Sequence, residues 1–161
     1  MRRLPVVALS AVVLAAIPTI ATAKHSPGPG KGPKRDLVVG SAKFPALPAH
    51  AHINAKSGPN GENPRGHFWL RQAGWQFRGS VTCVKVVGNR ASVGGRVNRS
   101  SGVGAPPVGS GFIQLTEDNG SPGRNDRSQT IFVASPPAVC PVPTTPFFVV
   151  AKGNYVVKDA T

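Results

Sequence analysis

The sequence predicts an all-β protein: a single antiparallel β-sandwich or barrel of about eight to nine short strands, following a signal peptide and a disordered basic arm. Two observations support this. Runs such as residues 49–55 alternate apolar and polar side chains with period two, as half-buried strands do. Clusters of Gly, Pro, Asn and Asp separate these runs at short intervals, and the central residues 67–97 contain no helical stretch.

The N-terminus has the three parts of a secretory signal peptide. Arg2 and Arg3 begin it, an apolar run covers residues 4–17, and a small-residue cleavage site ends at Ala23. The alternative is a membrane anchor, but spanning a bilayer takes about 20 apolar residues, and Pro18 interrupts this run. We therefore expect residues 1–23 to be a signal peptide cleaved after Ala23, and the protein to be secreted into the extracellular space without a transmembrane anchor.

Cleavage would leave 138 of the 161 residues, and the loss of Arg2 and Arg3 would lower the net charge from +13 to +11. Residues 24–36 are rich in Gly, Pro and basic side chains, with little to bury, so we expect a disordered arm. Its candidate polyanion-binding residues are Lys24, Lys31, Lys34 and Arg35. The alternative is a spacer without a contact of its own.

The domain at 37–161 is expected to consist of strands in the following order. The first strands cover 37–44 and 49–55; the central stretch 67–97 reads as strands joined by turns such as Ala73-Gly74 and Gly88-Asn89; later strands cover 111–117, 128–134, 147–151 and 155–159. The last two are expected to pair as a hairpin around residues 152–154. Residues 98–110 and 118–127 are expected to be loops, and the prolines of 135–146 exclude an inner strand there. Gly94-Gly95 predicts a bulge or a close backbone approach.

A set of short motifs, taken in their order along the chain, resembles the sequence pattern of a known family. The motifs are RGHF (65–68), VTCVKVVGNRASVGG (81–95), EDNGSPG (117–123) followed by Asp126-Arg127, a late cysteine, and GNYVVKDA (153–160). Over roughly residues 49–160 they resemble uncharacterised secreted β-rich domains common in actinobacteria. The resemblance implies a secreted all-β domain, sometimes placed beside other extracellular modules. It implies no activity and no catalytic residues.

The chain has two cysteines, Cys83 and Cys140. In an exported protein the simplest expectation is one disulfide between them, with Cα atoms within about 7 Å. The alternative is two separate buried thiols. Two cysteines cannot form a four-thiolate zinc site.

Two groups of side chains are candidate metal ligands. His50 and His52 point the same way on one strand, and His67 lies on the next, so three imidazoles could bind zinc or copper if the strand register allows it. Asp118, Asn119 and Asp126 offer oxygen ligands for calcium in a glycine-containing loop. The alternatives are solvated or hydrogen-bonded histidines and a structural turn in which Asp126 bonds the backbone. We favour these alternatives and expect no cofactor.

The chain offers few residues or motifs that could support catalysis. The chain has six carboxylates, and it lacks a G-x-S-x-G elbow, a P-loop and an H-E-x-x-H motif. Trp69 and Trp75 could form a platform for sugar or peptide, although packing is the more common role of such residues. Scattered arginines could form one basic face or a generally solvated surface. They are Arg65, Arg71, Arg78, Arg90, Arg96 and Arg99.

The sequence therefore predicts a secreted, non-catalytic β domain, an interaction module at the cell envelope with affinity for anionic polymer. Without a nucleic-acid motif or aromatic interleaving, specific nucleic-acid recognition is not expected. The alternatives are a structural or adhesive extracellular domain without a discrete ligand, and an enzyme or metal-binding protein of unrecognised type. A flat basic face would favour envelope binding; a pocket of convergent polar groups would favour an enzyme.

Overall fold

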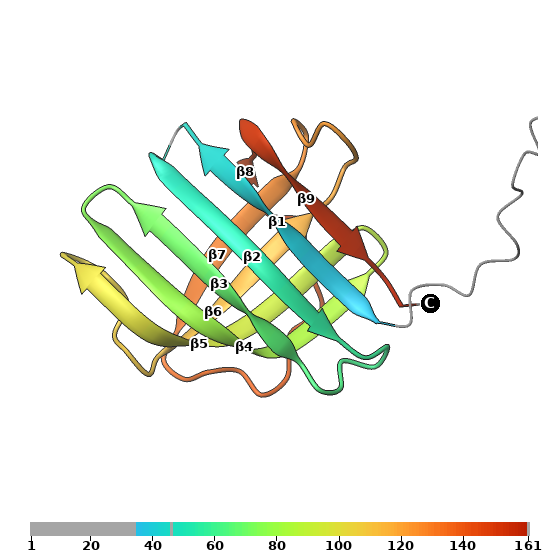
Figure 1. Cartoon of the computed structure of the whole chain (residues 1–161), viewed down its shortest axis with the longest axis horizontal. Helices are drawn as coiled ribbons and strands as arrows, with labels where there is room; N and C mark the ends of the chain where they lie inside the picture. The colour runs from blue at the N-terminus through green and yellow to red at the C-terminus, as the bar shows by residue number, and fades with distance from the viewer. Residues whose placement is uncertain (1–34, 46, 161) are drawn as a thin grey trace, which may run out of the picture. The chain divides into compact units, whose positions relative to one another are not determined.

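The computed structural model describes residues 35–45 and 47–160. These residues form nine antiparallel strands and no helix, so the predicted all-β class is confirmed (Figure 1). The strands are β1 (Asp36–Phe44), β2 (Ala49–Ser57), β3 (Arg65–Gln72), β4 (Trp75–Val87), β5 (Arg90–Gly102), β6 (Gly111–Glu117), β7 (Arg127–Val133), β8 (Phe148–Val149) and β9 (Lys152–Lys158).

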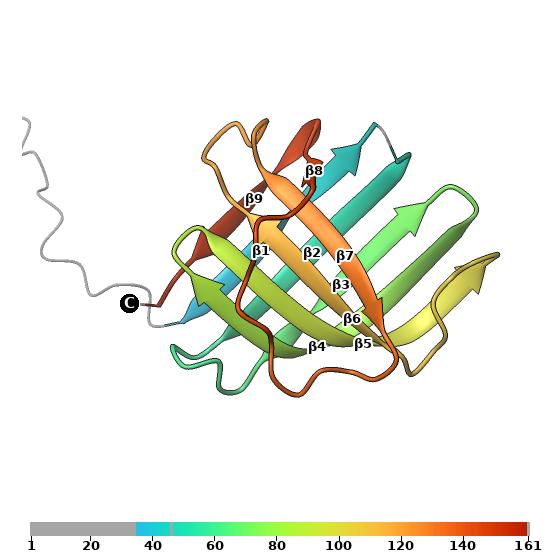
Figure 2. The ribbon, with the colours of Figure 1, turned by 180° about the vertical axis from the view of Figure 1, so that it is seen from behind.

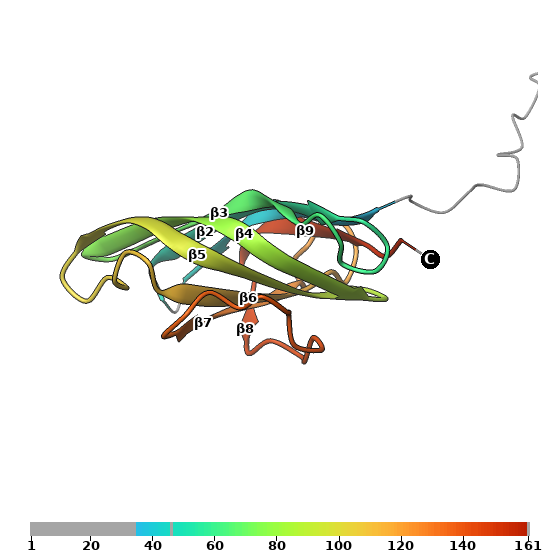
Figure 3. The same ribbon diagram turned by 90° about the horizontal axis from the view of Figure 1, so that it is seen from below.

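The strands form one sheet in the order β8-β7-β6-β5-β4-β3-β2-β1-β9. Short turns such as Gly88-Asn89 place successive strands side by side, and only β9 leaves this sequence by adding to the outer edge of β1. The sheet curls into a half-barrel, so that β6, β7 and β8 lie beneath the layer of β1 to β5 and β9 (Figure 3).

The concave side of the curl holds the core. Alternation along each strand sends one set of side chains inward, and the largest fully buried ones include Phe68, Phe77, Phe112, Ile53 and Tyr155. The rings of Phe68 and Phe112 stack with centroids 5.2 Å apart, which joins β3 to β6 across the curl. Packing of rings from opposite layers holds the half-barrel curled.

Side chains of the loop between β6 and β7 connect that end of the sheet to β9. The Asp126 carboxylate accepts hydrogen bonds from the backbone N–H of Asn119 (2.8 Å) and of Tyr155 (2.7 Å), and the Asp118 carboxylate accepts one from Val157 (3.0 Å). The Val150 N–H also donates to the Asp126 carbonyl at 2.8 Å. Two acidic loop residues thus satisfy the backbone donors at the edge of β9.

A disulfide joins Cys83 and Cys140, whose Cα atoms lie 5.4 Å apart, as predicted. It fixes the proline-rich segment 134–147, which crosses β4 and β5 from outside (Figure 2). The Thr82 hydroxyl donates to the Pro137 carbonyl at 2.7 Å. A Cβ at Gly94 would collide with the Cys83 sulfur and with Pro137, and a Cβ at Gly95 would collide with the Ser80 carbonyl, so the close backbone approach expected at Gly94-Gly95 is confirmed.

Strand boundaries and one strand pairing differ from the sequence prediction. β1 begins at Asp36, which is buried and not part of the arm. β5 continues to Gly102, because it pairs with the full length of β4. The terminal hairpin was wrong: β8 pairs with β7, whereas β9 pairs with β1. The Ala151 N–H donates to the Lys43 carbonyl at 3.1 Å, which directs the chain to the opposite edge.

Candidate functional site

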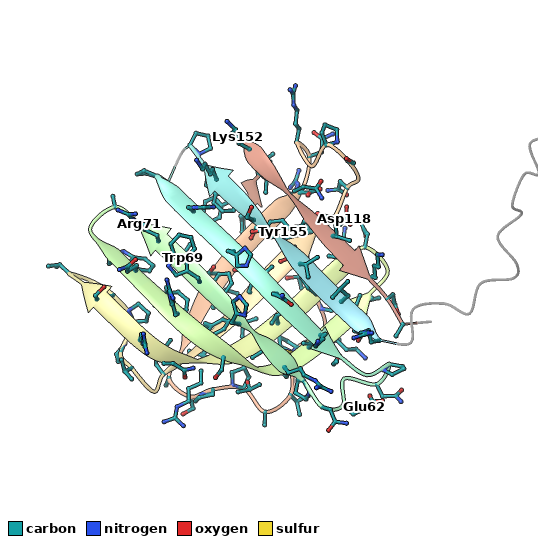
Figure 4. The ribbon with its side chains drawn as sticks, viewed as in Figure 1. Glu62, Trp69, Arg71, Asp118, Lys152 and Tyr155 are labelled. Atoms are coloured by element: carbon teal, nitrogen blue, oxygen red, sulfur yellow. A yellow bond between two sulfur atoms is a disulfide. The ribbon has the colours of Figure 1, made fainter. Side chains whose placement is uncertain are left out.

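The convex side of β9, β1, β2, β3, residues 75–80 of β4 and the end of β5 carries the candidate site. On β3, Phe68 and Leu70 are buried, so the alternate residues His67, Trp69 and Arg71 point outward. Residues directly opposite on neighbouring strands share a face, and the register therefore identifies the other outward residues. Figure 4 looks onto this side of the sheet and labels Trp69, Arg71 and Lys152.

Nine basic side chains share this convex side, and we call them the basic face. They are Lys43, Lys56, Arg65, Arg71, Arg78, Arg96, Arg99, Lys152 and Lys158. All are exposed except Lys56, which is half-buried. The face therefore holds nearly half of the 19 Lys and Arg residues of the chain.

Three pairs on the basic face place like charges directly opposite each other. The pairs are Lys43–Lys152, Lys56–Arg65 and Arg78–Arg99. Such cross-strand pairs are destabilising. Within the described part of the chain no member of the face forms a salt bridge, whereas Arg90 pairs with Glu117 at 3.0 Å on β5 and β6.

All six carboxylates of the chain lie off the basic face, and each accepts a hydrogen bond that supports the fold. Five accept backbone N–H groups: Asp36 from Ala160, Glu62 from Asn60, Asp118 from Gly120 and Val157, Asp126 from Asn119 and Tyr155, and Asp159 from Gly88. The sixth, Glu117, pairs with Arg90. The face thus concentrates positive charge without a salt bridge among residues 35–45 and 47–160, which raises the local concentration of anions.

The arginines were expected to lie either on one face or dispersed. Five of the six lie on the basic face, and Arg90 is the exception. Sequence reasoning missed Lys43, Lys56, Lys152 and Lys158, although strand alternation gives their side. Their grouping depends on the pairing of β9 with β1, which follows from no local pattern.

The three histidines also lie on this convex side. The rings of His52 and His67 stack with centroids 5.6 Å apart, and His50 packs edge-on against Trp69 at 5.1 Å. Burial, the charge of Lys43 and the neighbouring His52 lower the pKa of His50. No group of three or more His, Cys, Asp or Glu side chains placed to hold a metal occurs among residues 35–45 and 47–160.

The two tryptophans have different surroundings. Trp75 packs against the buried ring of Phe77 and the exposed ring of Phe132, with centroids 6.3 and 5.9 Å apart. Trp69 is half-buried on the outward side, between its cross-strand neighbours His52 and Arg78. Trp69 therefore offers an aromatic surface within the basic face.

The candidate calcium ligands have partners in the chain. Both carboxylate oxygens of Asp126 accept backbone N–H groups, and so do both of Asp118. The Asn119 side-chain N–H₂ donates to the Asn125 carbonyl at 2.8 Å. This geometry is that of a turn held by Asp side chains, and it ties the loop to β9.

Three hollows differ in suitability for a ligand. One of about 600 Å³ includes Lys43, His50, Arg71 and Lys152, and one of about 400 Å³ includes Trp69 and Arg78. The third, apolar and at the mouth of the half-barrel, measures about 90 Å³. Ligand sites typically measure about 300–1,000 Å³. Both basic hollows fall in this range, and so do two further hollows, one of about 380 Å³ lined by Arg78 and Arg99 and one of about 340 Å³ lined by Arg71.

Of the arm residues, Arg35 is exposed just before β1, and Lys24, Lys31 and Lys34 lie outside the described residues, as does the expected signal peptide. A helix able to cross a membrane is absent from the described part of the chain. Comparisons with protein families, with curated proteins and with solved structures found no match. The resemblance to secreted β-rich domains remains an expectation.

Proposed function

We propose that the chain is an exported, non-catalytic interaction domain that binds an anionic polymer of the cell envelope through its basic face. The observation that carries the proposal is the retention of like charges opposite each other, as at Arg78 and Arg99, without a carboxylate among them. A fold selected for stability alone gains nothing from such pairs. A polyanion laid across the strands would convert each repulsion into two attractions.

The form of the face also supports a polymer. Its cations extend over six strands and not around one point. Strands are spaced about 4.8 Å apart, so a row across the sheet meets successive charges of a linear chain. Exposed charges are screened beyond about 8 Å at physiological ionic strength, and affinity should therefore depend on many close contacts and fall with salt.

The test is binding of the protein to purified cell wall at low and high salt. Arg78→Gln with Arg99→Gln removes two charges from the face. Lys85→Gln with Arg124→Gln removes two exposed charges outside it and serves as the control. We expect binding that decreases steeply with salt and is weakened about tenfold by the first pair. Binding insensitive to salt, or equal losses in both variants, would contradict the proposal.

A further inference from the structure

A large hollow lies at one end of the basic face. Its volume is about 600 Å³, and its walls come from the β1–β2 turn (Pro45 and Pro48) and the β3–β4 turn (Ala73 and Gly74). We call it the hairpin pocket. Its charged and ionisable lining residues are Lys43, His50, Arg71 and Lys152.

These four residues come from four adjacent strands and form one row. Lys43 on β1 lies opposite both Lys152 on β9 and His50 on β2, and His50 lies opposite Arg71 on β3. At a strand spacing of about 4.8 Å, the row spans about 15 Å. Three permanent cations and one imidazole thus line one shallow concavity of the basic face.

The His50 imidazole is held in position by packing, and its pKa depends on the neighbouring positive charge. His50 packs edge-on against Trp69 with centroids 5.1 Å apart, which limits its orientation. The groups that face it are Lys43 from β1, His52 from its own strand, and Trp69 and Arg71 from β3. The charge of Lys43 contributes to its lowered pKa. An anion bound in the hairpin pocket would raise the pKa of His50, opposite to the effect of Lys43.

We propose that the hairpin pocket binds a phosphoryl group carried by the polymer. A planar carboxylate is satisfied by one bidentate arginine. A phosphate has more acceptor oxygens and, as a monoester, about −1.5 to −2 charges at neutral pH, which matches cations that approach from β9, β1 and β3. Because this inference rests on the proposed polymer binding, it specifies the chemistry that the basic face selects.

The experiment compares three probes: inorganic phosphate, long-chain polyphosphate and polygalacturonate, a polymer of carboxylates. Lys43→Gln with Arg71→Gln alters the hairpin pocket. Lys56→Gln with Arg65→Gln removes the same two residue types at the opposite end of the basic face and is the control. NMR titration of the His50 ring reports on the pocket, and thermal unfolding verifies that both variants are folded.

We expect inorganic phosphate to shift the His50 resonances saturably and polyphosphate to bind more tightly than polygalacturonate. The pocket variant should bind both phosphate probes at least about tenfold more weakly, and the control should retain its affinity for inorganic phosphate. If both polymers bind equally and phosphate gives no saturable shift, the pocket inference fails while polymer binding stands. If phosphate saturates the pocket but neither polymer nor cell wall binds, the proposed function fails instead.

Discussion

Arg78 on β4 and Arg99 on β5 lie directly opposite each other on the convex side of the sheet. Neither forms a salt bridge with a carboxylate of the described residues. Their positions follow from alternation on both sides of a register shift between Arg78 and Gly79, which sets Arg99 outward. The repulsion between them is a local cost that the rest of the fold must offset.

Neutralising one member of such a pair is therefore expected to stabilise the protein. Arg99→Gln should raise the free energy of unfolding by about 0.5 kcal/mol in urea titrations at low salt. The gain should shrink in 1 M salt, where the screening length is only about 3 Å. Arg90→Gln is a control with the opposite expected sign. It removes the salt-bridge partner of Glu117 and should lower the free energy of unfolding by about 1 kcal/mol. A destabilised Arg99→Gln variant would contradict the charge argument.

The second prediction concerns the loop that holds β9. Asp126 is fully buried, and its carboxylate accepts two backbone N–H groups, those of Asn119 and Tyr155. Asp126→Ala leaves the buried Tyr155 N–H and the partly buried Asn119 N–H without that partner and should lower the free energy of unfolding by about 3 kcal/mol. Asp118→Ala, at a half-buried site, should cost about 1 kcal/mol. Equal losses at the two positions in urea unfolding would refute the special role of Asp126.

The strands could be predicted from the sequence because alternation and turn residues are local signals. Gly88-Asn89 joins β4 to β5 as expected, and residues 49–55 lie within β2. The strand with which β9 pairs could not be predicted in this way. Its pairing with β1 brings together residues more than a hundred positions apart, and the Asp126 bond to Tyr155 helps to fix it.

The same distinction applies to the candidate site. Alternation alone puts His50 and His52 on one side of β2, and Trp69 with Arg71 on one side of β3. Whether those sides coincide depends on register, since a shift by one residue reverses a whole strand. In the structure His52 lies directly opposite Trp69, so the two sides coincide. The basic face is therefore a property of strand pairing and not of any single motif.

The third prediction concerns the disulfide. Cys83 and Cys140 are 57 residues apart, and on the chain-entropy model a cross-link of this length stabilises by about 4 kcal/mol. Replacing both with Ser should lower the free energy of unfolding by about that amount. Thiol titration of the denatured, unreduced protein should find no free thiol. Two titratable thiols in the unreduced protein would refute the pairing.

The fourth prediction concerns pH. Burial and the nearby Lys43 and His52 hold the pKa of His50 below its ordinary value of 6.5. The unfolded chain then binds this proton more readily than the folded protein does, so stability should fall as the pH drops below about 6.5. His50→Gln should reduce that dependence in unfolding measurements between pH 7.5 and pH 5. An NMR pKa at or above the ordinary value would overturn this reading.

The fifth prediction separates the arm from the basic face. Residues 24–34 carry Lys24, Lys31 and Lys34, and their removal leaves β1 intact because β1 begins at Asp36. The sequence predicts that this arm is disordered, and charges on such a segment attract any polyanion alike. The deletion should therefore weaken binding to polyphosphate and polygalacturonate by the same factor and reduce the salt dependence. Neutralising Arg78 and Arg99 should instead change the ratio of the two affinities, because Arg78 is fixed opposite Trp69 and Arg99 is fixed opposite Arg78. Binding of both polymers at several salt concentrations measures both effects. A ratio changed by the deletion, or left unchanged by the double substitution, would show that selectivity does not come from the sheet.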